Sequence, residues 1–314
     1  MRSKKQIYGF SLIELMITML ISLVLMLGVM SIMVSTKRSY HVQNDMGRLS
    51  ENARFALELI ANDLRMAGCF GCPDQIPSGV IPLAGRNNDG ANSSDVILVS
   101  FVDGNRNAFS VVHAAPVALN ASPLQAGQNQ FTVTTRGELF VGDNVFVSDC
   151  VGSTSYTVQA ITSTQVTLNG NLDRTYDNNG QSHGAEMRRL VTYRYFTDGS
   201  SLFRDNGPIG AALSASNAEE LIEGVENMQI RYGEDTDGDG TINQYRDSDT
   251  VTNMQNVRAV RVTLLSNTIT PRSDRDKDTN TYKLGPDSSD TYDPTDDYLR
   301  RAIFTTTAEL RNIN

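Results

Sequence analysis

The feature that most constrains this chain is the apolar stretch Leu15–Val34, which contains no charged residue and no proline. A helix rises about 1.5 Å per residue, so a stretch of this length spans a hydrocarbon core of roughly 30 Å. Residues 1–8 carry Arg2, Lys4 and Lys5 and no acidic group, which keeps that end on the cytoplasmic side. The sequence therefore predicts one membrane-spanning helix close to the N-terminus.

The boundaries of this stretch exclude an ordinary secretory signal. Such a signal has a shorter apolar core followed by a small-residue cleavage site. Here the stretch runs into Lys37 and Arg38, so any cut lies before it. Glu14 stands where the apolar helix begins, and an ionised carboxylate there costs about 3 kcal/mol unless it finds a partner or reaches the interface. One interpretation of Glu14 is a residue that snorkels at the end of a simple signal anchor.

The second interpretation is an assembly signal. The basic leader ends in Gly9, Phe10 follows, and Glu14 stands at the fifth position after Gly9, directly before the apolar helix. This arrangement resembles the class III signal of type IV pilins and their relatives. The resemblance implies that a prepilin peptidase removes residues 1–9 by cutting between Gly9 and Phe10, and that it methylates the new amino group of Phe10. It also implies that Glu14 forms a salt bridge with the amino-terminal charge of a neighbouring subunit during assembly.

A helical pattern continues beyond the anchor. Apolar residues recur at spacings of three and four, and Gly68, Gly71 and Pro73 end the pattern. We expect one helix from about Phe10 to Met66, membrane-embedded over residues 10–36 and amphipathic over residues 37–67. Its apolar stripe consists of Val42, Met46, Leu49, Ala53, Ala56, Ile60, Leu64 and Ala67.

Residues 68–314 have the composition of β-structure. Short runs rich in Val, Ile, Thr, Tyr and Phe alternate with Gly, Asn and Asp. Most runs alternate apolar with polar residues, which suits an antiparallel sheet with one face covered by the helix. We expect an α+β fold, a type IV pilin-like lollipop in which a long N-terminal α-helix packs on an antiparallel β-sheet head with a β-rich insertion at 108–184. The predicted strands are Val96–Val102, Phe131–Thr134, Asn144–Ser148, Tyr156–Ile161, Gln165–Leu168, Met187–Phe196, Met228–Tyr232, Val257–Leu265 and Ala302–Leu310.

Charge and motif content narrow the function. The formal charge is −9, and an acidic body argues against nucleic acid as a partner. His41, His113 and His183 are isolated in the sequence, and there is no nucleophile elbow, zinc-protease motif or phosphate loop. We therefore expect a protein that is not an enzyme.

Three cysteines lie on the far side of the anchor from the basic leader, which places them in an oxidising compartment. We expect one disulfide with one thiol left over. Cys72 with Cys150 would tie the end of the helix to the head, Cys69 with Cys150 is an alternative, and Cys69 with Cys72 is a third. The closely spaced Cys69 and Cys72 also allow a redox or zinc role, but the sequence offers no second cysteine pair or histidine-rich partner nearby.

A calcium loop is the second informative motif. Oxygen-bearing side chains occupy the first, third and fifth positions, Gly240 the sixth, and Thr241 the seventh, where a backbone carbonyl acts as ligand. The twelfth position departs from the EF-hand pattern, because Arg246 replaces the bidentate Glu. Two alternatives are open: Asp247 or Asp249 supplies the missing carboxylate, or the site is weak and partly hydrated. The alternative is a solvated Asp-Gly turn. The candidate Ca²⁺ ligands are Asp235, Asp237, Asp239, Thr241, Asn243 and Asp247.

Further segments narrow the resemblance. The helix end Asn52–Cys72, the segment Tyr232–Gly240 and the C-terminal run Arg301–Asn312 are similar to the PilW minor pilins. That resemblance implies a low-abundance subunit that waits in the inner membrane with its head in the periplasm and then enters the extracellular pilus near its tip. The implied partners are other minor pilins, the major pilin, the prepilin peptidase, the assembly platform and a tip adhesin.

Two other functions remain open from the sequence. A J-type minor pseudopilin of type II secretion shares the leader, the long helix and related strands. A signal-anchored, calcium-dependent binding protein that never enters a filament would keep its leader and would not need Glu14.

Overall fold

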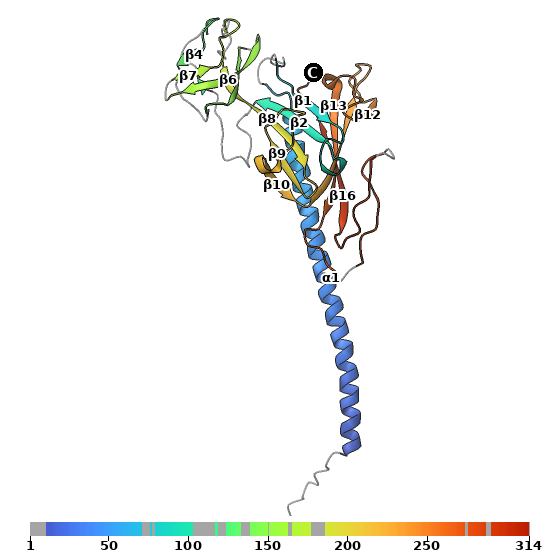
Figure 1. The fold of residues 1–314 in the computed structure, drawn as a ribbon. Coiled ribbons are helices and arrows are strands. Elements are labelled where there is room, and N and C mark those ends of the chain that lie inside the picture. Colours follow the sequence, from blue (N-terminus) through green and yellow to red (C-terminus); the bar gives the residue numbers. More distant parts are fainter. Residues whose placement is uncertain are drawn as a thin grey trace, which may run out of the picture. The chain divides into compact units, whose positions relative to one another are not determined.

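The computed structural model describes residues 11–70, 76, 79–102, 117–118, 124–132, 139–149, 151–162, 165–176, 186–273, 276–286 and 290–313. The chain divides into two compact units, Met1–Ser50 and Glu51–Asn314. The first unit holds most of the long helix, and the second holds the end of that helix and all of the described strands (Figure 1). A long N-terminal helix followed by antiparallel sheets confirms the predicted α+β class.

Helix α1 runs from Leu12 to Met66 without interruption. It ends where Gly68 adopts a positive φ of 76°, a conformation that ends helices and that glycine adopts without strain. A Cβ atom at Gly68 would also lie 2.3 Å from the carbonyl oxygen of Asn312. Both the backbone angle and this close approach require glycine, which confirms the predicted end of the helix.

The described strands form three antiparallel sheets. A ten-stranded sheet has the order β1-β2-β8-β5-β6-β7-β4, with β3 and β9 also paired to β8 and β10 paired to β9; a four-stranded sheet has the order β12-β11-β13-β16; β14 and β15 form a ribbon. The strands are β1 (Leu83–Arg86), β2 (Val96–Val102), β3 (Val117–Ala118), β4 (Gln130–Thr132), β5 (Asn144–Ser148), β6 (Ser153–Ile161), β7 (Gln165–Leu168), β8 (Glu186–Thr197), β9 (Ser201–Asp205), β10 (Glu219–Glu223), β11 (Val225–Glu234), β12 (Gln244–Arg246), β13 (Val257–Asn267), β14 (Tyr282–Lys283), β15 (Thr291–Tyr292) and β16 (Arg301–Glu309). Single 3₁₀ turns lie at Ala91–Ser93, Ala215–Asn217 and Met254–Asn256.

Strand β8 connects two parts of the large sheet. Its residues 190–195 pair with β2, and its first residues pair with β5 and β3. Its last residues, Arg194 to Thr197, pair with β9. Figure 1 shows β8 running between the green strands β4, β6 and β7 and the β1–β2 pair.

The end of helix α1 packs into the main core of the second unit. Ala56, Ile60 and Leu64 are buried together with apolar residues of β2, β8, β11 and β13. Fully burying a side chain such as Ile60 or Leu64 contributes about 2 kcal/mol. The predicted apolar stripe therefore faces both larger sheets over the part of the helix that belongs to this unit.

A second core lies inside the predicted insertion. Strands β4 to β7 bury Phe131, Val145, Val158 and Val166 around Tyr176. This cluster is separate from the helix core, although β5 joins the same sheet through β8. Strands β4 to β7 thus share a hydrophobic interior of their own, and the insertion at 108–184 remains a prediction.

One ionisable group of the helix lies in the main core. Asp63 is 7% exposed and accepts a hydrogen bond from the hydroxyl of Tyr195 on β8. Burial raises the pKa of Asp63 to about 6, against the opposing effects of the Tyr195 bond and the charge of Arg204. When folding raises the pKa of a carboxyl group, the free energy of unfolding falls as the pH increases from the unfolded pKa to the folded pKa.

We expect Asp63→Asn to change this pH dependence. The amide keeps an acceptor for the Tyr195 hydroxyl and does not ionise. The free energy of unfolding of the variant should therefore grow relative to that of the parent by about 3 kcal/mol as the pH rises from about 4 to about 8. Urea unfolding of the detergent-solubilised protein across this range measures the difference. Asp296→Asn, at an exposed position, is the matched control. A stability difference between Asp63→Asn and parent that is the same at every pH would contradict the assignment.

Candidate functional site

The first candidate site is the start of helix α1. Glu14 lies exposed in the first turn, flanked by the exposed side chains of Ile13 and Leu15. A carboxylate there also interacts favourably with the helix dipole. Gly9 and Phe10 lie outside the described residues, so the predicted cleavage and methylation at these positions remain predictions.

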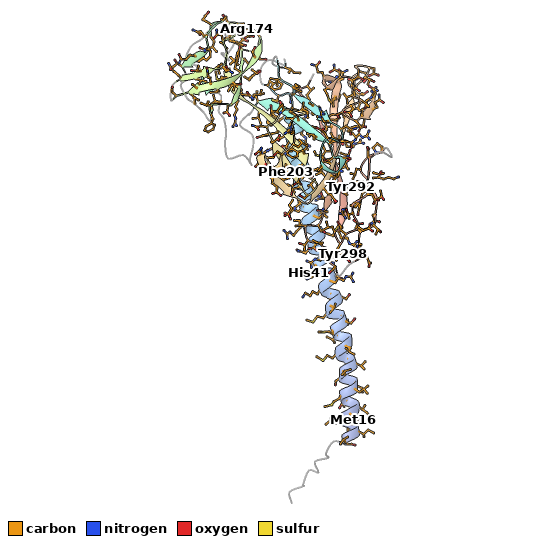
Figure 2. The ribbon with its side chains drawn as sticks, in the orientation of Figure 1. Met16, His41, Arg174, Phe203, Tyr292 and Tyr298 are labelled. Carbon is orange, nitrogen blue, oxygen red and sulfur yellow. The ribbon has the colours of Figure 1, made fainter. Side chains whose placement is uncertain are left out.

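The helix has the properties of a membrane anchor. It is long and apolar enough to cross a membrane, with a mean hydropathy of 2.6 in its most apolar part. Its large apolar side chains between Leu12 and Val34 are all at least 50% exposed. Met16 projects outward in Figure 2. Exposing this surface to water would be unfavourable in free energy, because each such side chain prefers an apolar environment by about 1.5–3 kcal/mol.

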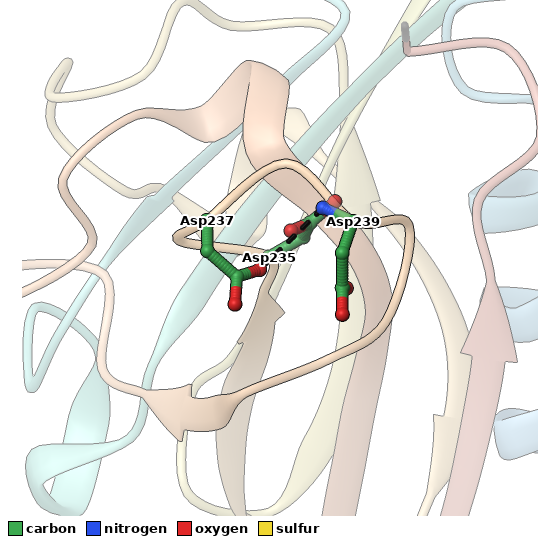
Figure 3. Close-up of side chains that lie close together, drawn as sticks. All are labelled: Asp235, Asp237 and Asp239. Atoms are coloured by element: carbon green, nitrogen blue, oxygen red, sulfur yellow. Dashed lines mark hydrogen bonds between the residues drawn. The ribbon is translucent and has the colours of Figure 1, made fainter.

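The second candidate site is the loop between β11 and β12. Asp235, Asp237 and Asp239 each place a carboxylate oxygen within 4.8 Å of the others (Figure 3). Asp235 is buried, while Asp237 and Asp239 are exposed. The hairpin that carries the loop is fixed by pairing of Tyr232–Glu234 with Gln244–Arg246. Among the described residues this is the one group of three such side chains close enough to hold a metal ion.

Backbone donors shape the loop around Asp235. Its carboxylate accepts hydrogen bonds from the N–H groups of Gly238 at 2.8 Å and Gly240 at 3.0 Å. Both glycines have positive φ, 78° and 87°, which a side chain would disfavour. Thr241 donates its N–H and its hydroxyl to Asp239. The loop therefore closes on the carboxylates of the first, third and fifth positions of the predicted motif.

Two carboxylates of the loop, Asp235 and Asp239, favour the ionised form. Burial alone would raise the pKa of Asp235, but the bonds from Gly238 and Gly240 and the nearby Arg258 guanidinium hold that pKa below its ordinary value. The Thr241 hydroxyl and N–H hold the pKa of Asp239 below its ordinary value. The site is thus anionic at neutral pH, as a hard cation requires.

The structure places the other predicted ligands differently. The side chain of Asn243 donates to Asp237 and accepts from Thr236, so it lies at the edge of the loop. Asp247 forms an ion pair with Arg231 at 3.0 Å and is not in the group of three carboxylates. Arg246 donates to the carbonyl of Thr250. The loop therefore brings together the first half of the motif and leaves the rest of a coordination shell to backbone oxygens and water.

The cysteines are described only in part. Cys69 has a free thiol, whereas Cys72 and Cys150 lie outside the described residues. Phe70, close to Cys72 in sequence, packs against Phe146 of β5 with ring centroids 6.3 Å apart. The predicted Cys72–Cys150 disulfide remains a prediction.

Two buried arginines were missed by sequence reasoning. Arg301 on β16 bonds the carboxylates of Glu226, Asp278 and Asp297, and its side chain is 1% exposed. Arg231 on β11 pairs with Asp247 and with Asp290. Tyr292, labelled in Figure 2, donates to Glu226 beside Arg301. The signal in the sequence was an Asp-rich segment next to strands that contain single arginines, and these ion pairs hold that segment on the sheet.

Comparisons with known proteins give family matches to the N-terminal region and to part of the head. A model of the prokaryotic N-terminal methylation motif matches residues 4–30, and a model of the type IV pilus-assembly protein W family matches residues 194–312. The second match begins in β8 and reaches the end of the described chain, so it includes β9 to β16 and the Asp235 loop. The long N-terminal helix, the methylation motif and the antiparallel sheets define a membrane-anchored type IV pilin. Over residues 194–312 the chain is similar to the PilW family, which supports a PilW-family type IV pilin.

Other comparisons add little. No curated protein matches the chain. A solved structure, the tailspike protein gp49 from Pseudomonas phage LKA1, is 21% identical over 24% of this chain, with a TM-score of 0.19. The chain covers 14% of that protein, and a similarity of this size carries no argument about fold or function.

Proposed function

We propose that this pilin is a minor subunit of the priming and tip complex of a type IV pilus and promotes pilus assembly. The observation that carries the proposal is the match of the head to the pilus-assembly protein W family, together with the methylation motif at the other end of the chain. As a subunit of the pilus it would contribute to twitching motility and adhesion as a structural protein.

The proposed route follows the leader. The prepilin peptidase cuts between Gly9 and Phe10 and methylates the Phe10 amino group while the helix lies in the inner membrane and the head in the periplasm. The assembly platform then extracts the helix. Glu14 neutralises the amino-terminal charge of an adjacent subunit, because burying either charge alone among apolar helices costs several kcal/mol. The head then contacts other minor pilins, the major pilin and a tip adhesin at the end of the extracellular pilus.

Mass spectrometry of the N-terminal peptide tests this proposal. We expect a peptide that begins at methylated Phe10 in filaments sheared from the cell surface. The same peptide confined to membranes would favour the J-type pseudopilin of type II secretion. A chain that still begins near Met1 would favour a signal-anchored binding protein and would overturn the proposal.

We also propose that the Asp235 loop binds Ca²⁺. The three carboxylates and the carbonyl of Thr241 supply hard oxygen donors, and the carboxylates repel one another when no cation lies between them. Calcium accepts six to eight oxygens in flexible geometry, so water can complete a shell in which Arg246 supplies no carboxylate. Bound calcium would fix the turn between β11 and β12.

Calorimetric titration of the detergent-solubilised protein with Ca²⁺ measures this binding. We expect Asp237→Ala to weaken the affinity about tenfold or more, because it removes one of three carboxylate ligands. Asp296→Ala removes an exposed carboxylate outside the loop and should leave the affinity unchanged. Equal and negligible heats for the parent and Asp237→Ala would remove the calcium site from the proposal.

A further inference from the structure

The ten-stranded sheet contains a gap along one edge of β8. Along this edge, the pairing of β8 with β5 ends at Val145–Arg189, and its pairing with β9 begins at Asp205–Arg194. The same register places Asn144, the first residue of β5, opposite Leu190, so positions 191–193 of β8 have no strand opposite them within the described part of the chain. Their other edge is paired with β2 throughout.

The register shows which backbone groups face this gap. Asp198 donates its N–H to Ser201 across the β8–β9 turn, so Asp198 faces the β9 edge. Alternate residues of an antiparallel strand face the same edge, which places Arg194, Thr192 and Leu190 there too. Arg194 pairs with Asp205, whereas the N–H and C=O of Thr192 have no backbone partner among the described residues. Strand groups of this kind are the template for pairing with another chain.

A hollow lies against the gap on each face of the sheet. One hollow, of about 360 Å³, is lined by polar residues that include Asp143, Arg189, Arg204 and Glu219. The other, of about 500 Å³, is lined by apolar side chains that include Val80, Ile81, Leu98 and Ile209, together with polar residues such as Ser100, Ser155 and Asn169. Asn144, Leu190 and Thr192 line both. The two hollows thus lie on either side of one window in the sheet.

We propose that a loop tip of another pilin subunit enters this window and pairs with Thr192 in an extended conformation, antiparallel to β8. The proposal rests on the proposed function, which supplies such subunits. Three strand positions span about 10 Å, so β5 and β9 leave room for roughly three residues. This length fits the tip of a loop, whose two arms leave through one hollow, better than a full strand.

The linings define the chemistry of the inserted tip. Arg189 lies 3.6 Å from Asp143, and Arg204 lies 2.7 Å from Glu219, so the charges that border the first hollow are paired within the head. That face suits an uncharged polar side chain such as Ser, Thr or Asn. The apolar lining of the second hollow suits an aliphatic side chain. Successive residues of an extended segment point to opposite faces, so an alternating polar–aliphatic–polar tip satisfies both hollows while its backbone pairs with Thr192.

Short overlapping synthetic peptides from the major and minor pilins of the same cell are the probe. We expect peptides of alternating polar and aliphatic residues to bind the detergent-solubilised protein, and N-methylation of the backbone nitrogen that faces Thr192 to weaken that binding about tenfold or more. Asn144→Trp places a bulky ring at the shared edge of the two hollows and should weaken binding to a similar extent. Asn171→Trp, at an exposed loop position that lines neither hollow, is the matched control and should bind like the parent.

Hydrogen–deuterium exchange gives a readout that needs no variant. The Thr192 amide should exchange fast in the free protein and become protected when a binding peptide is present, while the amides of Val191 and Tyr193, which face β2, stay protected in both states. Binding that survives N-methylation, or a Thr192 amide already protected in the free protein, would overturn the proposal, as would a peptide set with no binder. Recovery of methylated Phe10 in sheared filaments tests the pilus function separately, so failure of the window leaves that function standing.

Discussion

Replacing Arg301 with methionine is expected to destabilise the Glu51–Asn314 unit by about 3–5 kcal/mol, enough to unfold many domains of this size. The Arg301 guanidinium lies 2.6 Å from Glu226, 3.0 Å from Asp278 and 2.7 Å from Asp297. Burial by itself raises the pKa of Asp278, but hydrogen bonds from Tyr282 and Arg301 hold it below its ordinary value. Without the arginine, Asp278 must either take up a proton or remain charged in a buried place, and both are unfavourable.

The effect can be measured as the midpoint of urea unfolding of the detergent-solubilised protein. Arg311→Met removes an exposed arginine close to the end of the same chain segment and should change stability by less than about 0.5 kcal/mol. Arg301→Lys keeps the charge but loses the planar fork that bonds several carboxylates at once, and it should fall between the parent and methionine. Equal midpoints for Arg301→Met and Arg311→Met would show that these ion pairs do not stabilise the head.

Replacing Glu14 with alanine is expected to reduce incorporation of the subunit into pili about tenfold or more. In the proposed assembly the Glu14 carboxylate is the partner of a neighbouring amino-terminal charge. Its loss leaves that amine uncompensated among apolar helices, at a cost of about 3 kcal/mol or more. Because the peptidase acts at Gly9 and Phe10, the variant should still be cut and methylated.

Quantitative mass spectrometry of membranes and sheared filaments separates these steps. The peptide beginning at methylated Phe10 should be present in membranes of the Glu14→Ala strain and depleted from its filaments. Thr18→Ala changes a residue one turn further along, whose hydroxyl bonds only the Leu15 carbonyl of its own helix, and should assemble like the parent. Parental levels of Glu14→Ala in filaments, with normal twitching, would contradict the proposed role.

Local sequence patterns predicted the elements in which local and tertiary preferences agree. The helix end at Met66 follows from Gly68, and the bounds of β2, β5 and β7 match the predicted Val96–Val102, Asn144–Ser148 and Gln165–Leu168. Two of the missed strands have compositions that disfavour strands. β1 contains Ala84 and Gly85, and β10 is mainly acidic, so both depend on neighbours already in the sheet.

The candidate sites differ in the same way: those within one short segment were predictable, and those built from distant segments were not. Asp235, Asp237 and Asp239 were predictable because all three lie on one tight turn. The Arg301 cluster joins residues as far apart in sequence as Glu226 and Arg301, and no short motif encodes it. The gap beside Thr192 was also invisible in the sequence, because it results from where β5 stops and β9 starts along a third strand.

The close approach of Gly68 and Asn312 has a consequence for the order in which the head is made. Ile313 is buried in the same core as Ala67 and Leu64, and Asn312 bonds the carbonyl of Arg65. The end of the helix therefore packs fully only after residues about 245 positions later in the sequence have been made. Contacts of such long sequence separation form slowly, and until they form the apolar side of the helix end stays open to other chains. Docking of Asn312 and Ile313, rather than formation of the helix, is the event that closes this core.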